Sequence, residues 1–260
     1  MKWIDTHTHL YLSQFDEDKK EVFDRLKAEG IEKVFLPNIE MDTLDSMNQL
    51  TVDYPGVAYA MVGLHPCSVK PDSIDKEMEG LRAELEARPD HYVAIGEIGI
   101  DLYWDQSTLD LQIKAFEEQI HWAKEFKKPI VIHCRESFDE IFEVLDREAG
   151  EDLTGIFHCF TGNHEQAKRV IGYGLHLGIG GVATFKNGGL DKSLEGIDIK
   201  HMVLETDSPY LAPVPFRGKR NESSYIPYVG SKLSAISGQP IEEVARVTTQ
   251  NAYSIFGIAE

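Results

Sequence analysis

The chain has 260 residues, and 26 Lys and Arg against 44 Asp and Glu give it a formal net charge of −18. This acidity excludes a broad basic face for nucleic acid, because such binding depends on many cations that neutralise phosphates. It also disfavours an anionic membrane surface as a partner.

Eight short runs rich in apolar and β-branched residues are the predicted strands. In chain order they are Lys2–Asp5, Lys33–Ile39, Val57–Leu64, Tyr92–Ile95, Pro129–His133, Gly155–His158, Leu175–Ile179 and Met202–Glu205. Runs that are apolar throughout are typical of strands buried on both faces, as in an all-parallel sheet. Their spacing fits repeated strand–helix–strand units.

Amphipathic helical patterns lie between these runs, with apolar residues that recur at intervals of three and four. The clearest are Asp18–Glu29, Ser73–Ala87, Leu109–Phe126, Phe138–Glu148 and His164–Gly172. The seventh unit has the weakest helical pattern, because several glycines interrupt it. Eight units predict an α/β fold of the (β/α)8 TIM-barrel type, which uses about 250 residues, as a single domain over residues 1–260. An open, doubly wound sheet is the alternative.

Metal-capable or acidic side chains follow most of the predicted strands. The segments that carry them are Asp5–His9, Gly63–Pro66, Gly96–Asp101, Ile132–Arg135, Phe157–Phe160 and Glu205–Pro209. Because the carboxyl ends of parallel strands meet at one face of a barrel, we expect these side chains to converge there. The other histidines lie on or beside helices or away from strand ends, and we expect structural or solvated roles for them.

The spacing of these residues predicts a metal site. His7 and His9 are two residues apart, so on an extended segment both imidazoles can reach one ion. Glu97 can bridge two ions with its two oxygens, His133 and His158 would hold a second ion, and Asp207 could complete the first. This donor set favours Zn, Mn, Co or Ni over Mg. Cys134 and Cys159 stand beside the histidines, and strand alternation predicts packed thiols there.

Together these motifs resemble those of the TatD family of metal-dependent deoxyribonucleases, and the resemblance runs along the whole chain. The motifs that carry it are His7–His9, Gly63–Pro66, Gly96–Gly99, Ile132–Glu136, Phe157–Gly162, Glu205–Leu211, Pro215–Asn221 and Asn251–Phe256. The family is similar to the amidohydrolase superfamily, which implies a distorted TIM barrel. The sequence departs from the family's usual residues at Tyr11, Glu136–Ser137 and Ser223, and none of these departures removes an expected ligand.

The resemblance implies two divalent cations (Mg²⁺, Mn²⁺ or Zn²⁺) and a set of site residues. The ligands would be His7, His9, Glu97 and Asp207 for one ion, and Glu97, His133 and His158 for the other. Near the substrate it implies His65, Arg135, Glu205 and Arg217. Glu205 could instead fix a ligand histidine or act as a weak ligand of a third ion.

The resemblance also implies phosphodiester hydrolysis, as a 3′–5′ exonuclease on single-stranded DNA or RNA. Asp207 would orient or deprotonate the attacking water, Arg135 would hold phosphate oxygens, and His65 would hold another oxygen or protonate the leaving group. Strand-end aromatic residues could stack on unpaired bases, although core packing is the alternative for each: Tyr103, Trp104, Phe160, Tyr210 and Phe216. The cluster Arg217–Arg220 could contact the phosphate backbone or form a solvated loop.

Three rival functions remain open at this stage: a small-molecule amidohydrolase, a D-aminoacyl-tRNA deacylase and a non-enzymatic metal-dependent binder. We expect a monomer in the cytoplasm. The three cysteines form no CxxC pair, which favours a reducing compartment. No apolar run approaches the roughly 20 residues that a membrane span needs.

Overall fold

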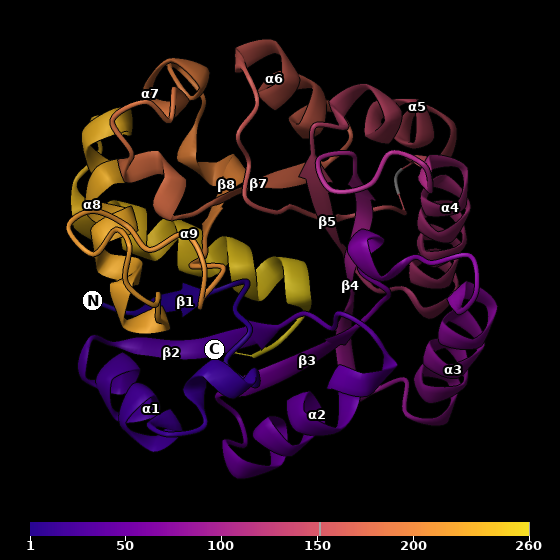
Figure 1. Cartoon of the computed structure of the whole chain (residues 1–260). Helices are drawn as coiled ribbons and strands as arrows, with labels where there is room; N and C mark the ends of the chain where they lie inside the picture. The colour runs from indigo at the N-terminus through magenta and orange to yellow at the C-terminus, as the bar shows by residue number, and fades with distance from the viewer. Residues whose placement is uncertain (151, 260) are drawn as a thin grey trace.

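The computed structural model describes residues 1–150 and 152–259, and within them the strands form one parallel sheet in the order β1 to β8 (Figure 1). The strands are β1 (Trp3–Asp5), β2 (Ile31–Leu36), β3 (Ala58–Val62), β4 (Tyr92–Asp101), β5 (Ile130–Arg135), β6 (Gly155–Phe157), β7 (Leu175–Ile179) and β8 (Met202–Leu204). Each strand pairs with the next one along the chain, as a strand–helix–strand repeat requires.

The last and first strands meet through a few hydrogen bonds. The backbone N–H of Thr6 donates to the carbonyl of Leu204 at 3.0 Å, and Thr8 forms a parallel bridge with Ser208. These contacts make a nearly closed barrel, so the predicted (β/α)8 TIM barrel is confirmed and the open doubly wound sheet is wrong. In a regular barrel the last and first strands pair along their length. Here the barrel is closed only by a few contacts at and just beyond the ends of β1 and β8 among the described residues.

Helices α1 to α8 lie on the outer side of the sheet, and α9 closes one end of the barrel. They are α1 (Lys19–Ala28), α2 (Leu44–Asp53), α3 (Ile74–Ala87), α4 (Leu109–Phe126), α5 (Phe138–Glu148), α6 (His164–Gly172), α7 (Leu190–Ser193), α8 (Ile226–Ser237) and α9 (Ile241–Phe256). The seventh unit has only the four-residue α7, in keeping with its glycine-rich sequence. Among the described helices, none has the length and apolar character needed to cross a membrane.

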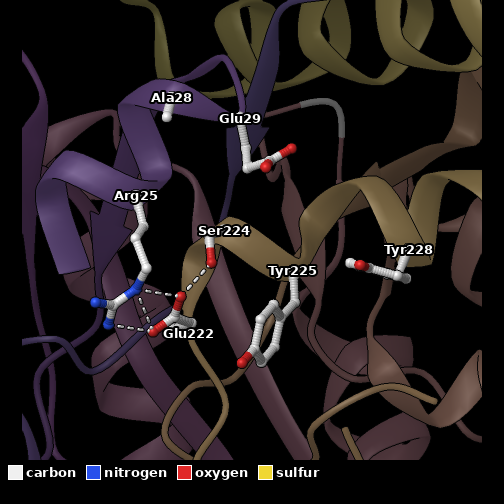
Figure 2. A pocket seen from close by; sticks show the side chains of 7 residues that line it. All are labelled: Arg25, Ala28, Glu29, Glu222, Ser224, Tyr225 and Tyr228. Atoms are coloured by element: carbon white, nitrogen blue, oxygen red, sulfur yellow. Dashed lines mark hydrogen bonds and ion pairs between the residues drawn. The ribbon is translucent and has the colours of Figure 1, made fainter. Parts of the chain in front are cut away.

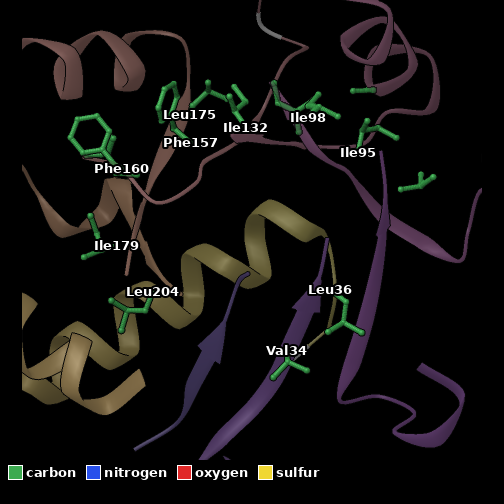
Figure 3. Packing of buried hydrophobic residues seen from close by; sticks show 14 of the residues in the cluster. Val34, Leu36, Ile95, Ile98, Ile132, Phe157, Phe160, Leu175, Ile179 and Leu204 are labelled. Atoms are coloured by element: carbon green, nitrogen blue, oxygen red, sulfur yellow. The ribbon is translucent and has the colours of Figure 1, made fainter. Parts of the chain in front are cut away.

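The larger hydrophobic core lies between the strands and the outer helices. Figure 3 shows part of this layer, from Val34 and Leu36 on β2 to Leu204 on β8. The helices contribute the buried faces that their sequence periodicity predicts, such as Phe116 and Ile120 on α4. Burial of these apolar side chains is the main force that holds the helices on the barrel.

A second core fills the barrel and is closed by the last helix. Its strand residues come from seven different strands: Ile4, Phe35, Met61, Ala94, Val131, Ile156 and Val203. Ala252, Tyr253 and Phe256 of α9 pack against them, and Figure 1 shows α9 lying across the barrel. These strand residues therefore point inward, which fixes the direction of the residues that follow them.

Strand β4 extends six residues beyond the predicted end at Ile95, as far as Asp101. Gly96 and Gly99 interrupt the apolar run in the sequence, so the pattern ended too early. Gly99 has a φ of 143°, and a Cβ at this position would lie 2.0 Å from the carbonyl oxygen of His133. Only glycine fits this close approach of β4 to β5, which places both Glu97 and Asp101 on the strand itself.

Candidate metal centre

Side-chain alternation carries the candidate ligands of three strands into the barrel mouth. Val131, Ile156 and Val203 point inward, and residues two positions further on point the same way. Those positions hold His133 on β5, His158 directly after β6 and Glu205 directly after β8. The strand period therefore brings these three residues together, whereas Asp207 follows a turn and has a positive φ of 56°.

Glu97 lies at the middle of the cluster and is 2% exposed. Its Oε1 lies 2.8 Å from His133 Nδ1 and 3.5 Å from His65 Nε2. Its Oε2 lies 3.1 Å from His7 Nε2 and 3.7 Å from His9 Nε2. The two carboxylate oxygens therefore face two different pairs of imidazoles, as a bridging carboxylate would.

The cluster holds its carboxylates ionised. Burial alone would raise the pKa of Glu97, but His7 and His65 hold it well below its usual range. Burial likewise opposes ionisation of Asp207, and the hydrogen bond to His9 lowers its pKa. Both groups are therefore available as anionic oxygen donors at neutral pH.

The histidines respond to the same environment in opposite directions. Burial alone would lower the pKa of His133, but hydrogen bonds to Asp101 and Glu97 raise it to about 9. Burial and the nearby His158 lower the pKa of His7, whose ring stacks on that of His158 with centroids 3.4 Å apart. If both stacked rings were protonated, two positive charges would be buried in contact with each other, which is unfavourable. The stacking therefore suits neutral imidazoles, the form that binds metal ions.

A buried nitrogen without a hydrogen-bond partner shows that this donor set fits cations. His7 is fully buried, and within residues 1–150 and 152–259 its Nδ1 has no hydrogen-bond partner, while its Nε2 faces the Glu97 carboxylate at 3.1 Å. Buried polar groups without a partner are rare, and a cation is a natural partner for an imidazole lone pair. Ligand atoms gather within 4.8 Å of one another in the groups His7–Glu97–His158, His7–His9–Asp207 and His65–Glu97–His133.

These groups differ in one respect from the sets that the sequence indicated. His133 lies with His65, its Nδ1 3.3 Å from His65 Nε2, whereas His158 lies with His7. His158 Nε2 is 3.9 Å from Glu97 Oε1. The structure thus brings His65, expected near the substrate, as close to Glu97 as the expected ligands are.

A hydrogen-bonded chain fixes the orientation of His9. The Tyr11 hydroxyl donates to the carbonyl of Pro37 at 2.6 Å, and it lies 2.8 Å from His9 Nδ1. Because the hydroxyl has only one hydrogen, it must accept from His9 Nδ1–H, which leaves the lone pair on Nε2. That nitrogen faces Asp207 at 3.5 Å. Tyr11 therefore orients a candidate ligand with a neutral hydroxyl.

We expect Tyr11→Phe to weaken metal binding about 10- to 100-fold, the usual cost of losing a partner of a ligand histidine. Metal titration of activity should show the loss at limiting metal and recovery in excess metal. Tyr59→Phe is the matched control, because the Tyr59 hydroxyl makes only a long contact of 3.5 Å to Gly56. Equal metal affinity in Tyr11→Phe and Tyr59→Phe would contradict this role for Tyr11.

Two carboxylates orient the remaining histidines. Asp101 Oδ2 lies 2.9 Å from His133 Nε2, and Glu205 Oε1 lies 2.9 Å from His158 Nδ1. In both histidines the other ring nitrogen faces Glu97, so each carboxylate selects the nitrogen that is presented to the centre. The sequence pattern assigns no role to Asp101, because the predicted strand ends at Ile95, before this residue. The spacing of four residues between Glu97 and Asp101 is the pattern that could have placed both side chains on the same face of the strand.

The backbone turns sharply at the ends of β6 and β8. Asp207 and Cys159 have positive φ angles of 56° and 44°, which are uncommon for residues other than glycine and cluster at functional sites. The turn at Cys159 breaks strand alternation, so its thiol lies within 4.8 Å of donor atoms of His158 and Glu205. Cys134 packs against the outer core as predicted.

The basic residues at the mouth fall into two kinds. Arg135 and Arg217 are exposed, and among the described residues their guanidinium groups make no ion pair; Arg217 lies over the ring of Phe185 at 3.7 Å. Arg220 instead forms two hydrogen bonds of 2.7 Å to Asp18. The cluster Arg217–Arg220 is therefore partly structural, and it supplies fewer free cations than its sequence indicates.

A separate cavity of about 400 Å³ lies beside α1 and α8 (Figure 2). Arg25 Nε lies 2.8 Å from Glu222 Oε1, and Arg25 Nη2 lies 2.6 Å from Oε2, so the pair is bidentate. None of the predicted site residues lines the cavity. Its arginine is already paired, and we assign the cavity no part in the chemistry.

A TIM barrel with buried imidazoles and carboxylates at its strand ends is typical of a metal-dependent enzyme. Comparisons with known proteins identify the class as metal-dependent hydrolases. A family model described as TatD related DNase matches residues 4–257. The metal-dependent hydrolase YabD of Bacillus subtilis (strain 168) is 39% identical over 258 residues, which cover 98% of this chain and 99% of YabD.

Solved structures of TatD homologues also match this chain over nearly its whole length. The crystal structure of YjjV, a TatD homologue from Escherichia coli K12, has a TM-score of 0.92 at 29% identity and covers 99% of this chain and 98% of YjjV. A TatD family hydrolase from Entamoeba histolytica has a TM-score of 0.87 at 20% identity, over 98% of each chain, and supports the fold. The chain belongs to the TatD related DNase family.

Proposed function

We propose that this hydrolase, one domain over residues 1–260, uses two metal ions to cleave phosphodiester bonds. The observation that carries the proposal is the position of Glu97, whose two oxygens lie 2.8 Å from His133 Nδ1 and 3.1 Å from His7 Nε2. A carboxylate between two imidazole groups is suited to bridge two cations. The imidazole-rich donor set favours Zn²⁺ or Mn²⁺ over Mg²⁺.

The proposed ligands are His7, His9, Glu97 and Asp207 for one cation, and Glu97, His133 and His158 for the other. When bound, two divalent cations supply an activated water and stabilise the attacking and leaving oxygens of an in-line displacement. Asp207 is ionised and lies at the open side of the cluster with its side chain 17% exposed. It is placed to orient the attacking water and to accept its proton.

The remaining residues of the mouth act on the phosphate and on the leaving group. Arg135 and Arg217 have exposed guanidinium groups that form no ion pair within the described residues, and we propose that they hold phosphate oxygens. His65 Nε2 lies 3.5 Å from Glu97 Oε1, and we propose that His65 holds another phosphate oxygen or protonates the leaving group. Glu205 is fully buried beside His158, so we propose that it positions this histidine and does not contact substrate.

The proposed substrate is a single strand of DNA or RNA, cleaved from its 3′ end. A chain with a net charge of −18 has no broad grip on a phosphate backbone, and two cations would add about four positive charges at the mouth alone. We therefore propose weak, salt-sensitive and distributive handling of a strand end by a cytoplasmic monomer.

The test is digestion of 5′-end-labelled single-stranded DNA, blunt duplex DNA and single-stranded RNA by metal-free protein to which Mg²⁺, Mn²⁺ or Zn²⁺ is returned. We expect the single strands to shorten from the 3′ end and the duplex to resist. Amino acid released from a 3′-aminoacyl ester with intact nucleotides would indicate a deacylase. Hydrolysis of cyclic amides or lactones alone would indicate an amidohydrolase, and intact substrates with every metal would indicate a binder.

A further inference from the structure

We propose that Tyr103, Trp104 and Arg135 form a stacking platform that binds an unpaired base of the nucleic-acid strand beside the metal centre. This inference rests on the proposed function, because it names the part of the substrate that this mouth recognises. The platform is defined by these three residues, which come from the segment after β4 and from the end of β5.

The three side chains pack against one another and still face solvent. The guanidinium carbon of Arg135 lies 3.7 Å from the ring centroid of Tyr103 and 5.4 Å from that of Trp104. The two rings meet edge to face with centroids 4.8 Å apart at 87°. Tyr103 is 49% exposed and Trp104 is 68% exposed. An edge-to-face pair leaves ring surface open to a third aromatic group.

The platform is fixed to the metal centre through one carboxylate. The backbone N–H groups of Tyr103 and Trp104 donate to Asp101 Oδ1 at 3.0 and 3.2 Å. The other oxygen of Asp101 lies 2.9 Å from His133 Nε2. Asp101 and Arg135 are also partners in the register of β4 and β5. A base on the platform would therefore lie next to the carboxylate that orients a candidate ligand.

An unpaired base is the occupant that this chemistry fits best. Every base has a π-face that can stack on an aromatic ring whatever the sequence, and Arg adds a cation–π contact. The bases of a duplex are already stacked on one another, so their faces are covered. Stacking also needs no basic surface, which suits a chain with a net charge of −18.

The tryptophans provide a direct readout of this contact. Trp3 and Trp122 are 1% and 3% exposed, so within the described part of the chain Trp104 is the only solvent-facing tryptophan. We expect a short oligothymidylate with hydrolysis-resistant phosphorothioate linkages to quench the tryptophan fluorescence of the metal-loaded protein. The same oligomer with abasic sugars, or a blunt duplex, should leave the fluorescence unquenched. Equal quenching by the abasic strand would overturn the proposal.

Variants measure the size of the effect. Trp104→Ala should weaken binding of a labelled oligothymidylate about 5- to 150-fold, the range measured for loss of one stacked base. Trp104→Phe should restore most of the affinity. Val52→Ala, which removes another exposed apolar side chain on α2, should bind as the wild type does. Wild-type affinity in both Trp104→Ala and Tyr103→Ala would overturn the platform.

A small phosphodiester without bases separates this inference from the proposed function. If the wild-type protein hydrolyses bis(4-nitrophenyl) phosphate and both Trp104→Ala and Tyr103→Ala bind the strand normally, the platform is wrong and the phosphodiesterase stands. If no phosphodiester is cleaved with any metal but oligothymidylate still quenches Trp104, the proposed chemistry fails and the platform stands.

Discussion

Glu97→Gln should reduce hydrolysis to the background of the metal-free protein. The loss should exceed about 100-fold, because removing a ligand costs more than removing a residue that only orients one, for which the cost is about 10- to 100-fold. The amide has nearly the same size, so the packing of the barrel mouth is kept. It cannot, however, offer two anionic oxygens to the histidines on its two sides. Metal analysis of the purified variant should show the loss of at least one ion per chain.

The matched control is Glu79→Gln, which makes the same change at an exposed position of α3. This variant should keep wild-type activity and metal content. Circular dichroism should show both variants folded, because the barrel core does not depend on Glu97. Full activity of Glu97→Gln in a metal-defined assay would contradict the proposal that Glu97 bridges two cations.

Divalent cations should raise the melting temperature of the metal-free protein by about 5–10 °C. A ligand that binds only the folded state stabilises it by about 2.7 kcal/mol at one hundred times its dissociation constant, and about 1 kcal/mol moves the midpoint of a chain of this size by about 2–4 °C. The ligand cluster exists only in the folded barrel, because its members come from distant strands. Thermal scans with and without Zn²⁺ or Mn²⁺ measure the shift.

This thermal shift should grow as the pH rises from about 6 to 9. Hydrogen bonds to Asp101 and Glu97 overcome burial and raise the pKa of His133 to about 9, and Glu205 likewise raises that of His158 to about 10. In the metal-free protein these protons stabilise the fold fully below about pH 6.5, and this contribution is lost as the pH rises through those values. Cations must displace the same protons, so they bind better at higher pH. A shift that is larger at pH 6 than at pH 9 would contradict the histidine ligands.

The sequence predicts the barrel and many of the residues at its mouth from two regularities, the two-residue period of a strand and the strand–helix repeat. The strand period of two links a buried residue such as Val131 to His133, and the strand–helix repeat brings all carboxyl ends to one face. These regularities predict that Glu97, His158 and Asp207 lie in one cluster. The reaction, phosphodiester hydrolysis, is implied only by the resemblance to the family, because the strand period and the strand–helix repeat predict positions and not chemistry.

Other features depend on tertiary contacts that no sequence pattern reveals. Asp101 belongs to the strand-end segment Gly96–Asp101, but the apolar pattern assigns it no role, because Gly99 interrupts the run before it. The close approach of β4 to β5 requires that glycine. The partnership of Arg220 with Asp18 joins residues 202 positions apart, so the basic cluster looked freer than it is. The role of Tyr11 depends on the carbonyl of Pro37, which only the folded chain brings into reach.

The central claim is that the cations held around Glu97 perform the hydrolysis, and one titration tests it most directly. Zn²⁺ or Mn²⁺ is added in small steps to metal-free protein while cleavage of a 3′-end-labelled single strand is followed. We predict no cleavage without metal, a rise with each addition, and a plateau at two ions per chain that Glu97→Gln does not reach. Full cleavage by the metal-free protein, or an unchanged plateau in Glu97→Gln, would contradict the account.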